Sequence, residues 1–193
     1  MRLIIGIAGA SGVIYGIRLL EYLRAMKGVE THLVLSRTAR MNIGVETDWR
    51  VRDVEALADQ VYANSDLGAA IASGSFRTDG MIVAACAMKT LSAIANSYAS
   101  DLIARAADVT LKERRKLVLM PRETPLHAGH CDLMAKASAL GAIIAPPMPA
   151  MYIRPQSVDD LVDHAAGRIL DLFGIDTPDM QRWPGLAEAR RRD

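Results

Sequence analysis

The chain has 193 residues, of which 51% are apolar, 14 are glycine and 2 are cysteine, and its formal net charge at pH 7 is +1. This length and apolar content predict one domain with a buried core, and a charge near zero argues against nucleic acid as a partner. Two cysteines are too few for a disulfide framework, and no leader pattern opens the chain, so we expect a reducing, cytoplasmic setting. No apolar run approaches the ~20 residues of a membrane helix, and we expect no membrane partner.

Short apolar runs and amphipathic stretches alternate along the chain. Buried strands are predicted at 2–8, 31–36, 80–85, 116–121 and 142–146. Apolar residues at helical spacing from Val13 predict a first helix that stops at Gly28. Further helices are predicted as two in 88–115, one in 126–140, and one opened by a capping box of Ser157 and Asp160.

The region from residue 47 to 79 has the weakest pattern. Here "ALADQ" indicates a short helix and "ASGSFRTDG" a loop. The alternation of strands and helices predicts a doubly wound parallel α/β sheet of three layers, Rossmann-like in type. We expect a single domain over residues 1–193 with a C-terminal tail from about 176, whose basic end "ARRRD" is a solvated terminus.

A glycine-rich turn follows the first predicted strand. In "GIAGASGVIYG" the glycines are Gly6, Gly9 and Gly12, so the G-x-G-x-x-G dinucleotide fingerprint fails by one position. Two interpretations stay open. The turn is either a tight strand-to-helix connection with Ser11 as the helix N-cap, or a set of free backbone N–H groups that bind a phosphate with Ser11 close to the chemistry.

Polar and glycine residues follow each predicted strand. In chain order these are Gly9, Ala10 and Ser11, then Ser36, then Ala87, Met88, Lys89 and Thr90, then Arg122 and Glu123, and last the segment that runs to Tyr152. Parallel strands end at one edge of a sheet, so the sequence predicts a binding site there. Lys89 and Thr90 lack the preceding glycine of a P-loop, and no tyrosine has lysine four residues on, which disfavours triphosphate sites and short-chain dehydrogenases.

Three charged or metal-binding groups admit a structural and a functional interpretation. Arg122 and Glu123 are either a surface ion pair or a phosphate-neutralising arginine beside a proton-transferring carboxylate. Arg168 falls on the apolar stripe that Leu161, Ala165 and Leu172 form on the last helix. There it must snorkel or meet an anion, and we favour the anion. His127 and His130 lack a third ligand at a clear spacing, so no metal site is predicted.

Several stretches resemble the UbiX family of flavin prenyltransferases, in the branch encoded beside hydroxyarylic acid decarboxylases and once described as a component of those enzymes. They are "GASG", "SRTARMNIGVETD", "ASGSFRTDGMIVAACAMKTLSAIANSY", "RAADVTLKERRKLVLMPRETPLH", "PPMPAMY" and "PQSVDDLVDHAAGRILDLFGI". The resemblance implies a flavoprotein that joins a dimethylallyl group from dimethylallyl monophosphate to N5 and C6 of reduced FMN, without a metal. The prenylated FMN then serves a UbiD-type decarboxylase, and the family assembles as homododecamers with sites between subunits.

The resemblance also implies residue roles. FMN would be bound by Gly9, Ala10, Ser11, Ser36, Ala87, Met88, Lys89, Thr90 and Arg122; the prenyl phosphate by Lys112, Tyr152 and Arg168; and protons would be moved by Glu123, with Ser11 nearby and Glu46 as a weaker candidate. Relatives carry serine where this chain has Ala87, so one hydroxyl is missing. Two alternatives stay open: a non-catalytic FMN-binding assembly subunit of a hydroxyarylic acid decarboxylase, and a flavin-dependent cysteine decarboxylase.

Overall fold

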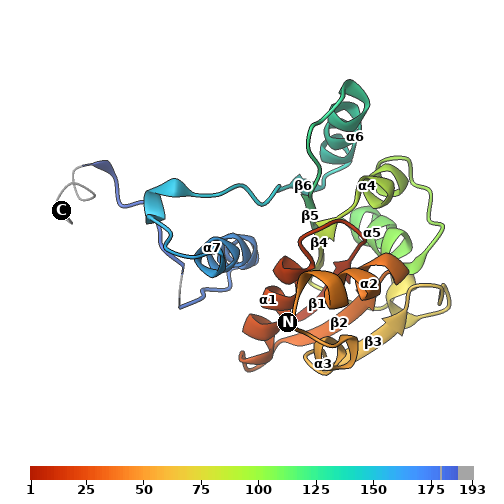
Figure 1. The fold of residues 1–193 in the computed structure, drawn as a ribbon. Helices are drawn as coiled ribbons and strands as arrows, with labels where there is room; N and C mark the ends of the chain where they lie inside the picture. Colours follow the sequence, from red (N-terminus) through yellow and green to blue (C-terminus); the bar gives the residue numbers. More distant parts are fainter. Residues whose placement is uncertain (179, 187–193) are drawn as a thin grey trace. The chain divides into compact units, whose positions relative to one another are not determined.

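The computed structural model describes residues 1–178 and 180–186, which belong to two compact units (Figure 1). The first unit spans Met1–Pro147 and the second spans Met148–Asp193. That the two make a single domain over 1–193, with a tail from about residue 176, stays a prediction. The basic "ARRRD" end lies outside the described residues.

Six strands of the first unit form one parallel sheet. They are β1 (Arg2–Ile7), β2 (Glu30–Leu35), β3 (Gln60–Ala63), β4 (Gly80–Cys86), β5 (Lys116–Pro121) and β6 (Ile143–Ile144). Their order across the sheet is β3-β2-β1-β4-β5-β6. The chain therefore adds β2 and β3 on one side of β1, and then crosses over to add β4, β5 and β6 on the other side. This reversal confirms the predicted doubly wound fold and places its switch point between β1 and β4.

Helices cover both faces of the sheet. They are α1 (Val13–Arg24), α2 (Arg37–Glu46), α3 (Val51–Glu55), α4 (Met88–Ala95), α5 (Leu102–Lys112), α6 (Ala128–Ala139) and the short 3-10 helix η1 (Ala70–Ala72). The Ile7 side chain lies against Gly16 of α1, whereas a Cβ on the neighbouring Gly6 would face Ile103 of α5. Because successive strand residues point to opposite faces, α1 and α5 lie on opposite faces of the sheet.

The weakly patterned region differs from the sequence prediction. The short helix lies at Val51–Glu55, just before "ALADQ", and is followed by a strand, β3, that the sequence did not predict. β3 is an edge strand whose residues are exposed or half-buried, so it lacks the apolar signature of the central strands. At the opposite edge β6 keeps only two residues, and α1 ends at Arg24 rather than at Gly28.

The second unit contains the 3-10 helix η2 (Met151–Ile153) and α7 (Val158–Asp171). The predicted capping box is confirmed: the Ser157 hydroxyl accepts from the Asp160 N–H, and the Asp160 carboxylate accepts from the Ser157 N–H. The buried face of α7 is carried by Val162, Ala166, Ile169 and Leu170. The buried face of α7 is therefore rotated about the helix axis relative to the predicted apolar stripe. Arg168 lies outside this buried face and is exposed.

No helix of the described residues is both long enough and apolar enough to cross a membrane.

Candidate functional site

The ends of the four central strands are joined by backbone hydrogen bonds. The bonds run from Ala8 N to Ala85 O (3.1 Å), from Ser36 N to Ile7 O (3.0 Å) and from Arg122 N to Cys86 O (3.2 Å). They lie at or just past the carboxyl ends of β1, β2, β4 and β5. The glycine turn, Ser36, the segment 87–90 and Arg122 are thus brought to one edge, beside the switch point.

The turn between β1 and α1 depends on two glycines. Gly12 is the N-cap of α1 and has φ 98°, a left-handed conformation that favours glycine. A Cβ on Gly9 would lie 2.5 Å from Cβ of Thr38, so a side chain there would collide with α2. The interpretation of Ser11 as the N-cap is wrong, because the cap falls one residue later and the exposed Ser11 makes no capping bond.

Glu46, at the end of α2, binds the start of α1. Its Oε2 accepts hydrogen bonds from Gly12 N at 2.7 Å and from Val13 N at 3.3 Å. Asn42, one turn earlier, points its amide nitrogen at the carbonyl oxygens of Gly9 (3.4 Å) and Ala10 (3.3 Å). The protein's own carboxylate therefore occupies the amides that a phosphate would use at this helix, and Glu46 fixes the shape of the turn.

The start of α4 presents uncapped backbone donors. Ala87 has the extended backbone of an N-cap, φ −70° and ψ 150°, but makes no side-chain capping hydrogen bond. Met88, Lys89 and Thr90 form the first turn that follows. Neither the Lys89 ammonium nor the Arg122 guanidinium has a hydrogen-bond or ion-pair partner within residues 1–178 and 180–186. This corner of the edge is rich in unused donors, which suits a phosphate or a flavin ring.

Tyr15 lies beside the candidate site and was not among the residues expected there from the sequence. Its ring would lie 3.1 Å from a Cβ on Gly12, and Cγ of Arg122 lies 3.9 Å from the same point. Burial raises the pKa of the Tyr15 phenol, and the nearby Arg122 charge partly opposes that rise. The phenol therefore stays protonated at neutral pH beside the arginine. A tyrosine three residues into the helix carries no distinguishing sequence signal, since helical spacing predicts only packing.

Glu123 extends from the end of β5 into solvent. Its Oε1 accepts from the Thr124 N–H at 3.0 Å, a local bond that leaves the other carboxylate oxygen open. The carboxylate and Arg122 are neighbours in sequence, but no ion pair joins them in the described structure. Of the two interpretations given by the sequence, the surface ion pair is wrong.

Lys112 does not lie at this edge within one copy of the chain. α5 starts after Asp101, and its 11 residues carry the chain about 16 Å along the helix axis before Lys112. There the Lys112 ammonium pairs with the Glu113 carboxylate beside Gly74. Lys112 can therefore act at such a site only if it reaches the carboxyl edge of the sheet in a neighbouring copy of the chain.

Tyr152 and Arg168 lie in the second unit. The Tyr152 hydroxyl is 2.9 Å from Nε2 of His164 and donates to the Gln181 carbonyl at 3.2 Å. Arg168, with 48% of its side chain exposed, pairs with Asp171 at 2.6 Å. The expectation that Arg168 lies on the apolar face of α7 is thus wrong: the side chain is about half exposed and pairs with Asp171, a carboxylate that Arg182 also contacts. Binding of a further anion by Arg168 stays a prediction.

Among the described residues, the other chemically notable groups do not form a second reactive centre. Burial raises the pKa of the Cys86 thiol to about 12, so it stays protonated and unreactive at neutral pH. The His127 and His130 rings lie against each other at a tilt of 32°, with centroids 3.7 Å apart. The described residues contain no group of three or more His, Cys, Asp or Glu side chains arranged to bind a metal.

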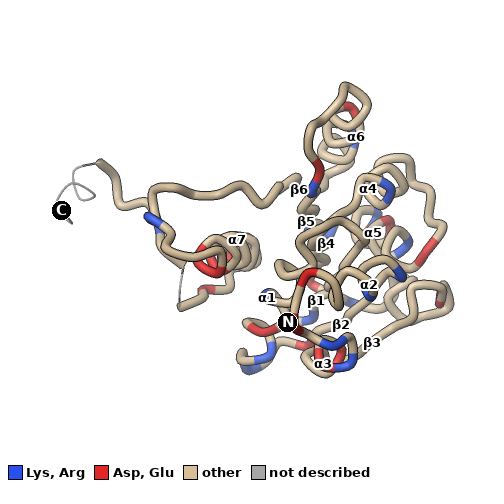
Figure 2. The backbone as a smooth tube through the Cα atoms, viewed as in Figure 1, with Lys and Arg blue, Asp and Glu red and all other residues tan. Residues whose placement is uncertain are grey.

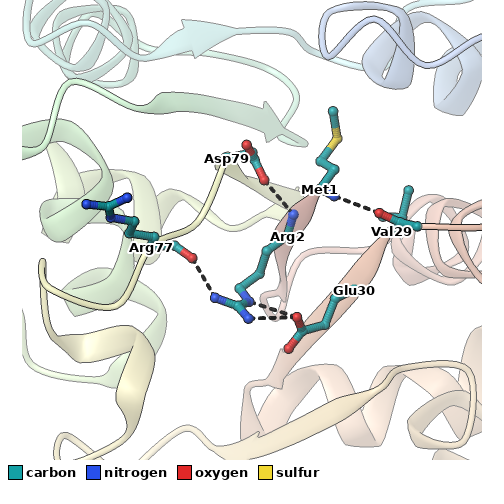
Figure 3. A pocket seen from close by; sticks show the side chains of 7 residues that line it. Met1, Arg2, Val29, Glu30, Arg77 and Asp79 are labelled. Atoms are coloured by element: carbon teal, nitrogen blue, oxygen red, sulfur yellow. Dashed lines mark hydrogen bonds and ion pairs between the residues drawn. The ribbon is translucent and has the colours of Figure 1, made fainter.

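A hollow of about 430 Å³ lies at the amino edge of the sheet, opposite the candidate site (Figure 3). Arg2 crosses it, pairing with Glu30 at 2.8 Å and donating its backbone N–H to Asp79 at 2.5 Å. Glu30 in turn binds the buried His32 at 3.0 Å. The charges here are largely satisfied within the protein, so this hollow is a structural junction of β1, β2 and β4.

Comparison with known proteins places the chain in a family. The model of the Flavoprotein family matches residues 1–170. The UbiX flavin prenyltransferase of Escherichia coli strain K12 is 54% identical over 186 residues, 95% of this chain and 98% of that protein. This chain belongs to the UbiX flavin prenyltransferases. A UbiX-like probable prenyltransferase of Streptomyces sp. strain D7 is 55% identical over 190 residues, which are 98% of this chain and 95% of that one.

Solved structures agree with this membership. A dodecameric, FMN-dependent UbiX-like decarboxylase of Escherichia coli O157:H7 superposes with a TM-score of 0.94 at 52% identity, over 96% of this chain and 100% of the other. AnUbiX in complex with FMN and dimethylallyl pyrophosphate gives a TM-score of 0.93 at 50% identity, over 95% and 97% of the two chains. The FMN-dependent cysteine decarboxylase SpaF shares the fold alone, with a TM-score of 0.60 at 19% identity.

Proposed function

We propose that this UbiX flavin prenyltransferase joins the dimethylallyl group of dimethylallyl monophosphate to N5 and C6 of reduced FMN and releases prenylated FMN. The observation that carries the proposal is its similarity, over 95% of its length at 50% identity, to a protein solved with FMN and dimethylallyl pyrophosphate together. The cysteine decarboxylase alternative loses support, because its likeness to this chain extends only to the fold.

The residues at the carboxyl edge fit a flavin mononucleotide. Gly9 lets the turn pack closely against Thr38 of α2, which holds the turn at this edge, and the uncapped start of α4 offers N–H groups. Lys89 and Arg122, which have no ion-pair partner among the described residues, add charge for a phosphate or for the flavin's electron-rich ring. We assign FMN binding to Gly9, Ala10, Ser11, Ser36, Ala87, Met88, Lys89, Thr90 and Arg122. Reduced FMN, when bound there, supplies the nucleophilic nitrogen and carbon.

The remaining residues act on the prenyl donor and on protons. Lys112, Tyr152 and Arg168 bind the phosphate of the donor and stabilise its growing charge as the allylic C–O bond breaks, so no metal is needed. Glu123 accepts and returns protons at its open carboxylate oxygen, with Ser11 close by. Glu46 is the weaker candidate for proton transfer, since its carboxylate is already bonded to the glycine turn.

The wider setting is proposed on the same basis. The product serves a UbiD-type decarboxylase, and the chain assembles as a homododecamer, as the UbiX-like protein of Escherichia coli O157:H7 does. Assembly would let Lys112 reach the edge of another copy. Two cysteines, one of them buried as a neutral thiol, suit a reducing cytoplasm.

The test is an anaerobic incubation of the protein with reduced FMN and dimethylallyl monophosphate, followed by mass spectrometry of the extracted flavin. We expect a flavin heavier by one prenyl unit that is absent without protein. Unchanged FMN bound to folded protein would instead support the alternative of an assembly subunit that binds flavin without catalysis.

The matched variants are Glu123→Gln and Arg168→Ala. Both side chains are exposed, so both variants should fold. Each should keep FMN binding while product formation falls about 100-fold or more, the usual effect of losing one proton-transfer or charge-stabilising group. Full activity in both would refute the assigned roles and leave the reaction itself standing.

A further inference from the structure

Among the residues of α7, all of which the structure describes, His164 is the only polar one that is buried. It is 7% exposed, and the aspartates of the helix, drawn in red in Figure 2, lie outside the buried set. The other buried residues of α7 are apolar or glycine: Val162, Ala166, Gly167, Ile169 and Leu170. Burial of an imidazole costs free energy unless its ring is hydrogen-bonded, so packing alone does not explain a histidine at this position.

His164 contacts the hydroxyl of Tyr152. Nε2 of His164 lies 2.9 Å from the hydroxyl oxygen, and the same hydroxyl donates to the Gln181 carbonyl at 3.2 Å. A phenol has one proton and a carbonyl can only accept, so this proton goes to Gln181. The bond between His164 and Tyr152 then needs a proton from the imidazole. Both contacts are satisfied only when Nε2 of His164 donates and the Tyr152 oxygen accepts.

Two neighbouring rings hold the ring of Tyr152. Its centroid lies 5.6 Å from that of His164 at an interplanar angle of 84°, and 5.6 Å from that of Trp183 at 69°. Both contacts have the edge-to-face arrangement that aromatic rings favour. Rotation about the C–O bond is then the main freedom left to the hydroxyl group. Tyr152 is 43% exposed, so the residue remains open to a ligand.

The direction of the bond from His164 decides what the Tyr152 hydroxyl can do. A hydroxyl that accepts an N–H bond keeps its own proton available, and rotation about the C–O bond can move that proton from the Gln181 carbonyl to a phosphate oxygen. The bond from His164 stays intact during this rotation, and it polarises the hydroxyl into a stronger donor. With the opposite tautomer, Nε2 would compete with the phosphate for the same proton.

We propose that His164 is a positioning residue: its Nε2–H donates to the Tyr152 oxygen and thereby directs the Tyr152 hydroxyl proton to the phosphate of the prenyl substrate. His164 acts through Tyr152 and does not itself contact the substrate. The inference rests on the proposed function for the role of Tyr152 as a ligand of that phosphate. The direction of the bond between the two side chains does not depend on it.

The first experiment determines the tautomer of His164 in the full-length protein without substrate, by solid-state NMR with isotope-labelled histidine. The chain has 4 histidines, and the signals of His164 are those lost in His164→Gln. Correlation with the ring carbon Cδ2 distinguishes Nε2 from Nδ1. At pH 8 we expect Nε2 of His164 to carry a proton. An Nε2 without a proton would overturn the proposal, whatever reaction the protein catalyses.

The second experiment titrates dimethylallyl monophosphate into protein loaded with oxidised FMN, so that binding is measured without transfer. It compares wild type with His164→Leu, which fills the buried space without an N–H, and with His164→Gln, whose amide supplies an N–H close to the position of Nε2. The control is Thr177→Val, at a residue buried in the same unit whose hydroxyl has no hydrogen-bond partner among the described residues. Thermal unfolding checks that every variant is folded.

His164→Leu should weaken binding about tenfold, His164→Gln should recover most of that loss, and Thr177→Val should match wild type. In a Tyr152→Phe background, His164→Leu should change the affinity by less than about twofold, because the hydroxyl through which His164 acts is gone. Unchanged affinity in His164→Leu, or an equal loss with and without the Tyr152 hydroxyl, would overturn the proposal.

Failure of the proposed function gives a different result. Wild type would then bind no dimethylallyl monophosphate, although Nε2 of His164 would still carry its proton. That result would overturn the role of both residues in binding the substrate, whereas a loss of affinity that is independent of Tyr152 would overturn the role of His164 alone.

Discussion

Glu46 combines a structural bond with a candidate chemical role, and the two can be separated at the scale of one residue. Its carboxylate accepts from two N–H groups at the start of α1. Glu46→Gln keeps an acceptor oxygen but loses the charge that favours a helix N-terminus, a loss of about 0.5–1 kcal/mol. For a protein of this size the midpoint of thermal unfolding should fall by roughly 1–4 °C.

Asp48→Asn is the control, because that exposed carboxylate two residues away has no partner in the described structure. Its midpoint should stay within about 1 °C of wild type, as for a surface substitution. An unchanged midpoint in Glu46→Gln would contradict the structural role. A fall in turnover of about 100-fold with unchanged FMN binding would show that Glu46 also transfers protons.

At the scale of one element, α4 lacks the side-chain N-cap that α2, α5 and α7 have. Ala87 has the extended backbone of an N-cap but no side chain that can accept a hydrogen bond. Ala87→Ser supplies a hydroxyl and should stabilise the protein by about 1 kcal/mol. The midpoint of thermal unfolding should rise in Ala87→Ser. In the control Ala93→Ser, inside the same helix, the midpoint should be unchanged or lower. A fall in Ala87→Ser would mean that the position has no room for the hydroxyl.

The junction of β1 and β2 at the amino edge makes stability depend on pH. Burial lowers the pKa of His32, although Glu30 partly opposes this, and a hydrogen bond from Arg2 lowers the pKa of Glu30 (Figure 3). As the pH falls below about 6.5, His32 is therefore protonated in the unfolded chain while it is still neutral in the folded chain. Proton binding favours the unfolded chain, so the free energy of unfolding decreases in acid. The contribution of Glu30 is lost later, as the pH falls through and below about 4.3.

The measurement is the unfolding free energy in urea at pH 7.5 and at pH 5.5. Wild type should lose stability over this interval, and His32→Gln should lose less of it because the titrating group is gone. His127→Gln, at an exposed histidine, should keep the wild-type dependence. An equal loss in His32→Gln and wild type would assign the acid sensitivity to another group.

At the scale of the whole molecule, the position of Lys112 predicts a site shared between copies. Lys112 and Glu123 should both be essential, yet α5 carries Lys112 away from the carboxyl edge of its own chain. We expect oligomers assembled from an equal mixture of Lys112→Ala and Glu123→Gln chains to regain about a quarter of wild-type turnover, since one site in four draws both intact residues from different copies. Each variant alone should be inactive. No recovery in the mixed oligomers would place both residues in a single copy.

The central sheet and its helices could be predicted from the sequence, because buried parallel strands are continuous apolar runs and the capping box at Ser157 is a local pattern. β3 could not, since it is only four residues long and, at the edge of the sheet, it needs little burial. The rotated face of α7 is a related failure. Leu161 and Leu172 fit a stripe with Arg168, but the packing of the second unit selected Val162, Ala166 and Ile169 instead.

The sequence by itself determined the family, because the chain is similar to its relatives over nearly its full length. It also determined the fold class and the convergence of polar groups at the carboxyl edge, because the alternation of strands, helices and loops along the chain follows from local patterns. Only the tertiary structure decided which of those groups remain available. Whether Glu46 occupies the amides at Gly12, whether Arg168 pairs with Asp171, and whether His164 meets the Tyr152 hydroxyl depend on side chains that are far apart in sequence or on the rotation of a helix. Such contacts are set by packing in three dimensions, on which the spacing of residues along the chain carries no information.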